Sequence, residues 1–71
     1  MTKQEVRKLT QSAILKGLST KIALKDIEVL KAISNDNTTL QCAEVKANNV
    51  IYSINFYSRT IRVNHNYASS F

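Results

Sequence analysis

The chain begins with apolar side chains spaced every three or four residues, which is typical of an amphipathic helix. These residues are Val6, Leu9, Ala13 and Ile14. Thr2 and Glu5 stand three residues apart ahead of the apolar run, the spacing of a capping box. Gly17 follows where a helix often ends on a left-handed residue, and Lys16 suits the negative end of the helix dipole. We predict a helix over residues 3–16 that ends at Gly17.

Residues 20–34 carry a second apolar pattern that permits two interpretations. The apolar side chains of Ile22, Ala23, Ile27, Leu30 and Ile33 fall within one arc of a helix. A strand over residues 27–33 stays open, because this part is rich in β-branched residues and runs into the turn-like sequence Asn35-Asp36-Asn37. A second helix is the favoured interpretation.

From Val50 onward apolar and polar residues alternate as in a strand. Val50, Tyr52, Ile54 and Phe56 fall on one face, with Ser53 and Asn55 on the other. Ile61 and Val63 repeat the alternation after a turn expected at residues 57–60. The sequence therefore predicts a β-hairpin over residues 50–64. Asn48-Asn49 predicts a further turn before it, since asparagine tolerates a positive φ better than most residues.

The stretch 38–47 decides the architecture. As a strand, it gives an α+β fold: an N-terminal amphipathic helix and a second helix packed on a small antiparallel sheet of about three strands. As a helix, it gives three helices and a hairpin in the winged-helix order, with 39–47 in the position of the recognition helix and 50–64 as the wing. The first alternative, in which residues 38–47 form a strand of a three-stranded antiparallel meander, is favoured. Residues 65–71 are expected to form a loosely ordered tail of a single small basic domain over residues 1–71.

The length of 71 residues permits one domain, and the single cysteine, Cys42, excludes an internal disulfide framework. Small secreted domains usually depend on such a framework, so a cytoplasmic setting is expected. The sequence has no apolar run near the roughly 18 residues that a membrane span needs, and it has no apolar signal-peptide core. We therefore expect no contact with a membrane.

Catalytic chemistry has few candidate residues in this sequence. His65 is the only histidine, and Cys42 lies among apolar residues that suit a packed thiol. Gly17 is the only glycine, which leaves no glycine-rich loop for phosphate binding. We expect no enzyme activity, no metal site and no cofactor. A non-enzymatic binding module is the remaining class.

The charge is unevenly distributed along the chain, with ten basic residues against five acidic ones. Residues 1–25 hold six basic side chains and one acidic one, residues 26–45 hold one basic and four acidic, and residues 46–71 hold three basic and no acidic. A basic head and a basic tail therefore flank an acidic middle. Local density of positive charge of this kind favours an anionic partner.

Two candidate binding surfaces follow from this distribution. Their residues are Lys3, Arg7 and Lys8 on the first helix, and Tyr57, Arg59 and Arg62 in the hairpin. The helix residues suit phosphate groups, while the hairpin suits a stacked base with phosphates beside it. Alternatively, these are a solvated helix face and an ordinary cross-strand pair. The favoured function is that of a basic regulatory protein that binds DNA or RNA.

A protein-directed function is the alternative. Small size, the lack of catalytic residues and unpaired sheet edges also fit a phage- or mobile-element-type inhibitor or adaptor. Such a protein would bind an acidic surface of a host protein, for example as an anti-CRISPR or anti-restriction factor acting on a nucleic-acid-handling machine. The same sheet edges make a homodimer plausible.

Overall fold

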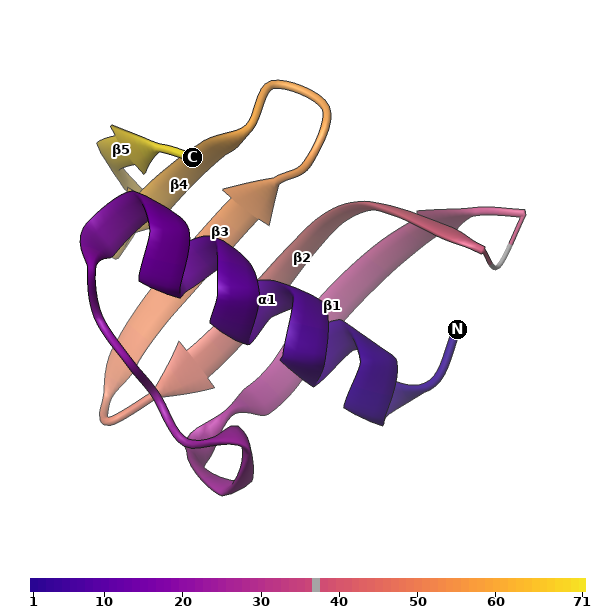
Figure 1. The fold of residues 1–71 in the computed structure, drawn as a ribbon, viewed down its shortest axis with the longest axis horizontal. Helices are drawn as coiled ribbons and strands as arrows, with labels where there is room; N and C mark the ends of the chain where they lie inside the picture. The colour runs from indigo at the N-terminus through magenta and orange to yellow at the C-terminus, as the bar shows by residue number, and fades with distance from the viewer. Residues whose placement is uncertain (37) are drawn as a thin grey trace.

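A computed structural model describes residues 1–36 and 38–71 as one helix lying across a five-stranded antiparallel sheet (Figure 1). The elements are α1 (Lys3–Leu18), the short 3-10 helix η1 (Leu24–Asp26), β1 (Glu28–Asn35), β2 (Thr39–Ala47), β3 (Val50–Asn55), β4 (Thr60–Val63) and β5 (Asn66–Ser70). The strands lie in the sheet in chain order, from β1 to β5. The α+β class is confirmed, with β1 and β5 as the edges of a simple meander.

The first helix is confirmed, and it extends two residues beyond the predicted end. The capping box is present: Thr2 Oγ1 accepts from the Glu5 amide at 3.2 Å, and the Thr2 amide donates to Glu5 Oε1 at 3.0 Å. The prediction that Gly17 ends the helix is wrong. Ser19, with φ 54°, is the left-handed residue, and its amide donates to the Leu15 carbonyl at 3.0 Å.

Gly17 instead lies where α1 packs closely against the sheet. A Cβ atom at this position would lie 2.6 Å from Ile61 Cδ1 and 3.2 Å from the Ser70 carbonyl oxygen. The glycine is therefore required by the packing of α1 on β4 and β5. The backbone conformation at the helix end does not require a glycine here.

The prediction of a second helix over residues 20–34 is wrong. This stretch forms η1 and then β1, in which Val29 lies opposite Val45 and Ile33 opposite Cys42. The register of β1 against β2 shifts between Val29 and Lys31 and again between Ile33 and Ser34. The first irregularity inserts Leu30 into β1 and breaks the two-residue alternation of the strand, so the remaining apolar spacing resembles that of a helix.

Residues 39–47 form strand β2, which overturns the winged-helix alternative, and the sheet has five strands instead of about three. The hairpin over 50–64 is confirmed as β3 and β4. Asn48 and Asn49 turn with φ values of 51° and 65°, as the sequence predicts. In the turn expected at residues 35–37, Asp36 has φ 57°. Asn37 lies outside the described residues.

Residues 66–70, expected within a loosely held tail, form strand β5 against β4. Ser69 Oγ donates to the Gly17 carbonyl at 2.6 Å, which ties this strand to the end of α1. The Phe71 amide donates to the Arg59 carbonyl at 2.9 Å. The last residues thus close the sheet beneath the C-terminal end of the helix.

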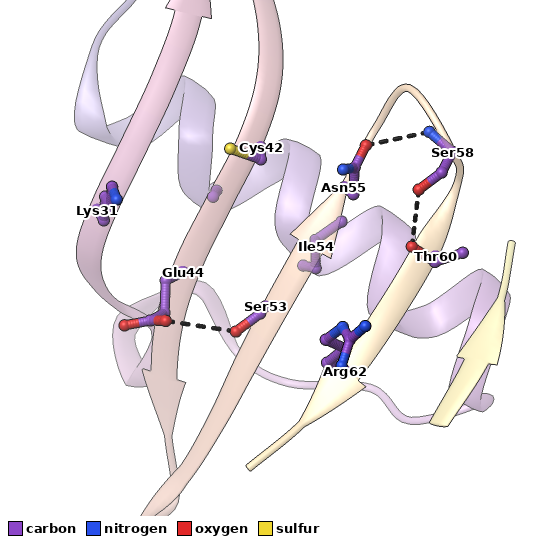
Figure 2. A pocket seen from close by; sticks show the side chains of 10 residues that line it. Lys31, Cys42, Glu44, Ser53, Ile54, Asn55, Ser58, Thr60 and Arg62 are labelled. Atoms are coloured by element: carbon purple, nitrogen blue, oxygen red, sulfur yellow. Dashed lines mark hydrogen bonds between the residues drawn. The ribbon is translucent and has the colours of Figure 1, made fainter. Parts of the chain in front are cut away.

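The core lies between α1 and one face of the sheet. Its most deeply buried apolar side chains are Ile14, Val45, Ile54 and Ile61. The opposite face of the sheet is covered by no element in the described part of the chain, as Figures 1 and 2 show. Across residues 1–36 and 38–71, no helix is both long and apolar enough to cross a membrane. The molecule therefore presents two unlike surfaces, a helix side and an open sheet face.

Candidate nucleic-acid interface

The loop that follows α1 is fastened along the helix by two side chains. Arg7 Nε donates to the Ile27 carbonyl at 3.0 Å, and Gln11 Nε2 donates to the Ile22 carbonyl at 2.7 Å. Both carbonyls belong to the segment that carries Lys21 and Lys25. Since these bonds are partly buried, they hold the loop beside α1.

A basic face results on the helix side of the molecule. We define it as Lys3, Arg7 and Lys8 of α1 together with Lys21 and Lys25 of the segment between α1 and β1, of which Lys25 lies in η1. The four lysines are exposed and Arg7 is half-buried. In the sequence, Lys21 and Lys25 belong to the basic head but not to the candidate binding residues, because a separate helix is predicted there. The hydrogen bonds of Arg7 and Gln11 hold their segment beside α1.

The charge of the helix side is not balanced by its own acidic residues. Residues 1–27 hold six basic side chains against two acidic ones, Glu5 and Asp26. The capping hydrogen bond from the Thr2 backbone, and after it the one from the Thr2 side chain, lower the pKa of Glu5 below its ordinary value of 4.5. Even with Glu5 ionised, the helix side keeps a clear positive surplus.

The open face of the sheet balances its charges through strand register. Glu28 of β1 lies opposite Lys46 of β2, and Lys31 lies opposite Glu44. Directly opposed residues of antiparallel strands point to the same side, so each pair places unlike charges together. Arg62 adds one positive charge to this face. The excess positive charge of the protein therefore gathers on the side of α1.

A hollow of about 370 Å³ lies on the open face between β1 and β4 (Figure 2). It is lined by Lys31, Cys42, Ala43, Glu44, Ser53, Ile54, Asn55, Ser58, Thr60 and Arg62. Its polar groups bond largely to one another: Asn55 Oδ1 accepts from the Ser58 amide at 3.0 Å, and the Ser58 and Thr60 hydroxyls are 2.8 Å apart. Lys31 and Arg62 share this hollow with Glu44, which weakens its attraction for an anion.

The hairpin candidates lie in different places, and only Arg62 is on the side of the sheet opposite α1. Arg62 lies on the open face, opposite Tyr67 of β5, and donates to the His65 carbonyl at 3.3 Å. Tyr57 lies in the β3–β4 turn, is 68% exposed, and its hydroxyl accepts from Gln41 Nε2 at 3.2 Å. Arg62 and the residues Lys3, Arg7 and Lys8 therefore lie on opposite sides of the sheet.

Arg59 is engaged with the last residue of the chain. Its Nε donates to the Phe71 carbonyl at 2.7 Å, and its guanidinium lies 4.9 Å from the centre of the Phe71 ring. Phe71 in turn meets Phe56 edge to face, with ring centres 5.7 Å apart. These contacts give Arg59 a structural part in closing the sheet.

Comparisons with protein-family models, with curated proteins and with solved structures found no match for the chain. Among the described residues, no group of three or more His, Cys, Asp or Glu side chains is placed to hold a metal ion. The basic face holds five of the ten basic side chains of the protein.

Proposed function

We propose that the protein is a non-enzymatic nucleic-acid-binding protein that contacts phosphate groups through the basic face. The observation that carries this proposal is the unequal charge of the two sides: a surplus on the side of α1 and cross-strand neutralisation on the open sheet face. A localised surplus of this kind attracts the nucleic-acid backbone and orients the protein upon it.

The side chains of the basic face suit phosphates in two ways. The lysines act as mobile point charges, whereas arginine offers a planar set of donors. Arg7 uses Nε on the Ile27 carbonyl, and its two terminal nitrogens make no hydrogen bond within the described residues. That bond fixes the guanidinium before any ligand arrives, which reduces the entropy lost on binding. Contacts of this type position a protein on nucleic acid without reading its sequence.

The proposal is tested by the dependence of affinity on salt. Labelled DNA and RNA oligonucleotides are titrated with the protein between about 50 and 200 mM salt, and binding is followed by fluorescence anisotropy. Lys8→Ala and Lys25→Ala should each weaken binding and lower the slope of log affinity against log salt by about 1.

Arg62→Ala is the matched control, because it removes one exposed positive charge from the open face. It should leave the salt slope nearly unchanged. Absence of binding at low salt would refute the proposal. A larger effect from Arg62→Ala than from Lys8→Ala would place the interface on the hairpin instead.

An acidic host-protein surface is the second candidate partner, since the same lysines fit carboxylates and steer association with them. This would be the function of a phage- or mobile-element-type inhibitor or adaptor. A pull-down from lysate treated with nuclease distinguishes the two candidate partners. A stoichiometric protein that is retained by the wild-type chain and lost with Lys8→Ala favours the second candidate, and loss of every bound species after nuclease favours nucleic acid.

A further inference from the structure

A second hollow lies on the helix side of the molecule, between α1 and the turn that joins β3 to β4. Its volume is about 170 Å³. Its walls are mainly apolar, with two cationic side chains beside them: Leu9, Ala13, Phe56 and Phe71 form the apolar part, and Lys16 and Arg59 carry the charge. We call it the helix-side hollow. Leu9 on its wall is 40% exposed, so the hollow leaves apolar surface in contact with water.

The apolar walls of the helix-side hollow are held in place by the core. Ala13 is 3% exposed, and Phe56 and Phe71 pack against buried core residues. The two rings also contact each other edge to face. A hollow that is formed in advance takes up a ligand with little ordering of the protein, which favours binding.

The charge beside the hollow is positive. Lys16 is exposed on α1, and the Arg59 guanidinium is held by its bond to the Phe71 carbonyl. The terminal nitrogens of Arg59 make no hydrogen bond within the described residues. In the described part of the chain, no acidic side chain lines the hollow, and Glu5, the acidic residue of α1, bonds back to the Thr2 amide. An apolar group that carries an anion is therefore the ligand that fits.

The size of the hollow limits what it can hold. It is smaller than the roughly 300–1,000 Å³ of sites that enclose a whole small molecule. A cavity of about 150 Å³ holds one benzene ring, so this one has room for a single ring or a branched alkyl group. One apolar side chain of a partner protein meets this limit.

We propose that the helix-side hollow receives a phenylalanine or leucine side chain from a protein partner, whose neighbouring aspartate or glutamate meets Lys16 and Arg59. An apolar anchor that fills a pocket beside an arginine is typical of the residues that dominate protein–protein binding. A nucleic-acid base also places a ring beside an anion. Much of its hydrogen-bonding edge would face apolar side chains, however, which costs free energy. The apolar walls therefore favour the protein side chain.

The helix-side hollow is separate from the basic face and does not depend on the proposed function. Leu9, Ala13 and Lys16 recur at helical spacing, so they share one side of α1, which faces the β3–β4 turn. Arg7 lies toward β1, because it donates to the Ile27 carbonyl just before that strand. The two sites therefore leave room for both partners on one molecule.

The test titrates the full chain with capped pentapeptides and follows its backbone amide chemical shifts. The peptide Ser-Glu-Phe-Glu-Ser should shift the amides of Leu9, Ala13 and Arg59. Replacement of its phenylalanine by serine should raise the dissociation constant by about tenfold or more, since burial of the ring is lost. Replacement of both glutamates by glutamine should raise it by about two- to fivefold, the range of an exposed ion pair.

Variants of the protein test whether the peptide binds in the hollow. Leu9→Glu should abolish binding of Ser-Glu-Phe-Glu-Ser, because it puts a carboxylate on the apolar wall. Leu15→Glu is the matched control, since Leu15 is a similarly exposed leucine of α1 outside the hollow. Lys16→Ala should raise the dissociation constant by about two- to fivefold, whereas Lys8→Ala should leave it unchanged. Circular dichroism verifies that each variant keeps the fold.

The inference is overturned by an absence of shift changes at about 1 mM peptide, by equal affinity for the phenylalanine and serine peptides, or by equal loss of binding with Leu9→Glu and Leu15→Glu. A single-stranded oligonucleotide whose binding is lost with Leu9→Glu and kept with Leu15→Glu would place a base in the hollow, and this too would overturn it. Nucleic-acid binding without peptide binding contradicts this inference alone. Peptide binding without nucleic-acid binding contradicts the proposed function alone.

Discussion

The close approach of α1 to the sheet makes Gly17→Ala the most informative test of the packing. In an open helix this change is stabilising by roughly 0.8–1 kcal/mol, because alanine is the better helix former. Here the added Cβ would lie 2.6 Å from Ile61 Cδ1, 3.2 Å from the Ser70 carbonyl oxygen and 3.4 Å from Phe71 Cβ. The substitution therefore sets helix propensity against a steric conflict.

The steric conflict should prevail. The Ile61 side chain is fully buried, so its terminal methyl group can move only by displacing neighbouring core atoms. The Ser70 oxygen belongs to the backbone of β5, which the Ser69 hydrogen bond holds against Gly17. Overpacking of this kind costs typically about 1–3 kcal/mol. After the gain in propensity is subtracted, we expect the free energy of unfolding to fall by about 1 kcal/mol.

Urea denaturation followed by circular dichroism measures this change, and thermal unfolding should show a melting temperature lower by about 4–8 °C. Ser12→Ala on the exposed side of α1 is the control, and its effect should stay within about 0.5 kcal/mol. If Gly17→Ala instead raised the free energy of unfolding by about 0.8–1 kcal/mol, the full gain in helix propensity, the reasoning would be refuted. Such a result would mean that α1 does not pack closely against the sheet at Gly17.

Two further outcomes are expected. Hydrogen bonds from Thr2 lower the pKa of Glu5, so the stabilisation from its ionised form is present above its ordinary pKa of 4.5 and is lost as the pH falls through the lower folded value. Glu5→Gln should therefore reduce the acid-dependent loss of stability in that range, and urea titrations that show the same loss in both proteins would contradict this. Arg59→Ala should lower the free energy of unfolding by about 1 kcal/mol, because the hydrogen bond to Phe71 and the ring contact are lost. A loss no larger than that of Arg62→Ala would contradict the structural role of Arg59.

The parts of the fold that the sequence predicts are those specified by local signals. The capping box of Thr2 and Glu5 marks the start of α1, and alternation marks β3 and β4. Asn48-Asn49 marks a turn by its tolerance of positive φ. Each signal lies within a few residues of the structure that it determines, so no distant contact is needed to interpret it.

The two edge strands depend on distant contacts, and the sequence does not reveal them. In β1, the irregularity at Leu30 removes the alternation that would identify a strand. In β5, Asn66–Ser70 has no apolar alternation, and its place is set by β4 and by the bond from Ser69 to Gly17. The close approach of Ile61 and Ser70 to Gly17 explains why the only glycine lies inside α1 rather than at its end.

The candidate interface is also predictable only in part, because some of its residues follow from local signals and others depend on distant contacts. Lys3, Arg7 and Lys8 follow from the helical periodicity of α1. The addition of Lys21 and Lys25 depends on the hydrogen bonds that fasten their loop to the helix. Neutralisation of the open face depends on the register of β1 against β2, which no local pattern discloses.

Mapping of backbone amide chemical shifts during addition of a short DNA or RNA oligonucleotide tests the basic face most directly. We expect the shift changes to concentrate in residues 3–8 of α1 and in residues 19–25 of the segment that follows it, and to fade as salt is raised. Amides of Ser53, Asn55 and Arg62 on the open face should move little. Shift changes centred on those three residues, or no shift changes at low salt, would contradict binding through the basic face.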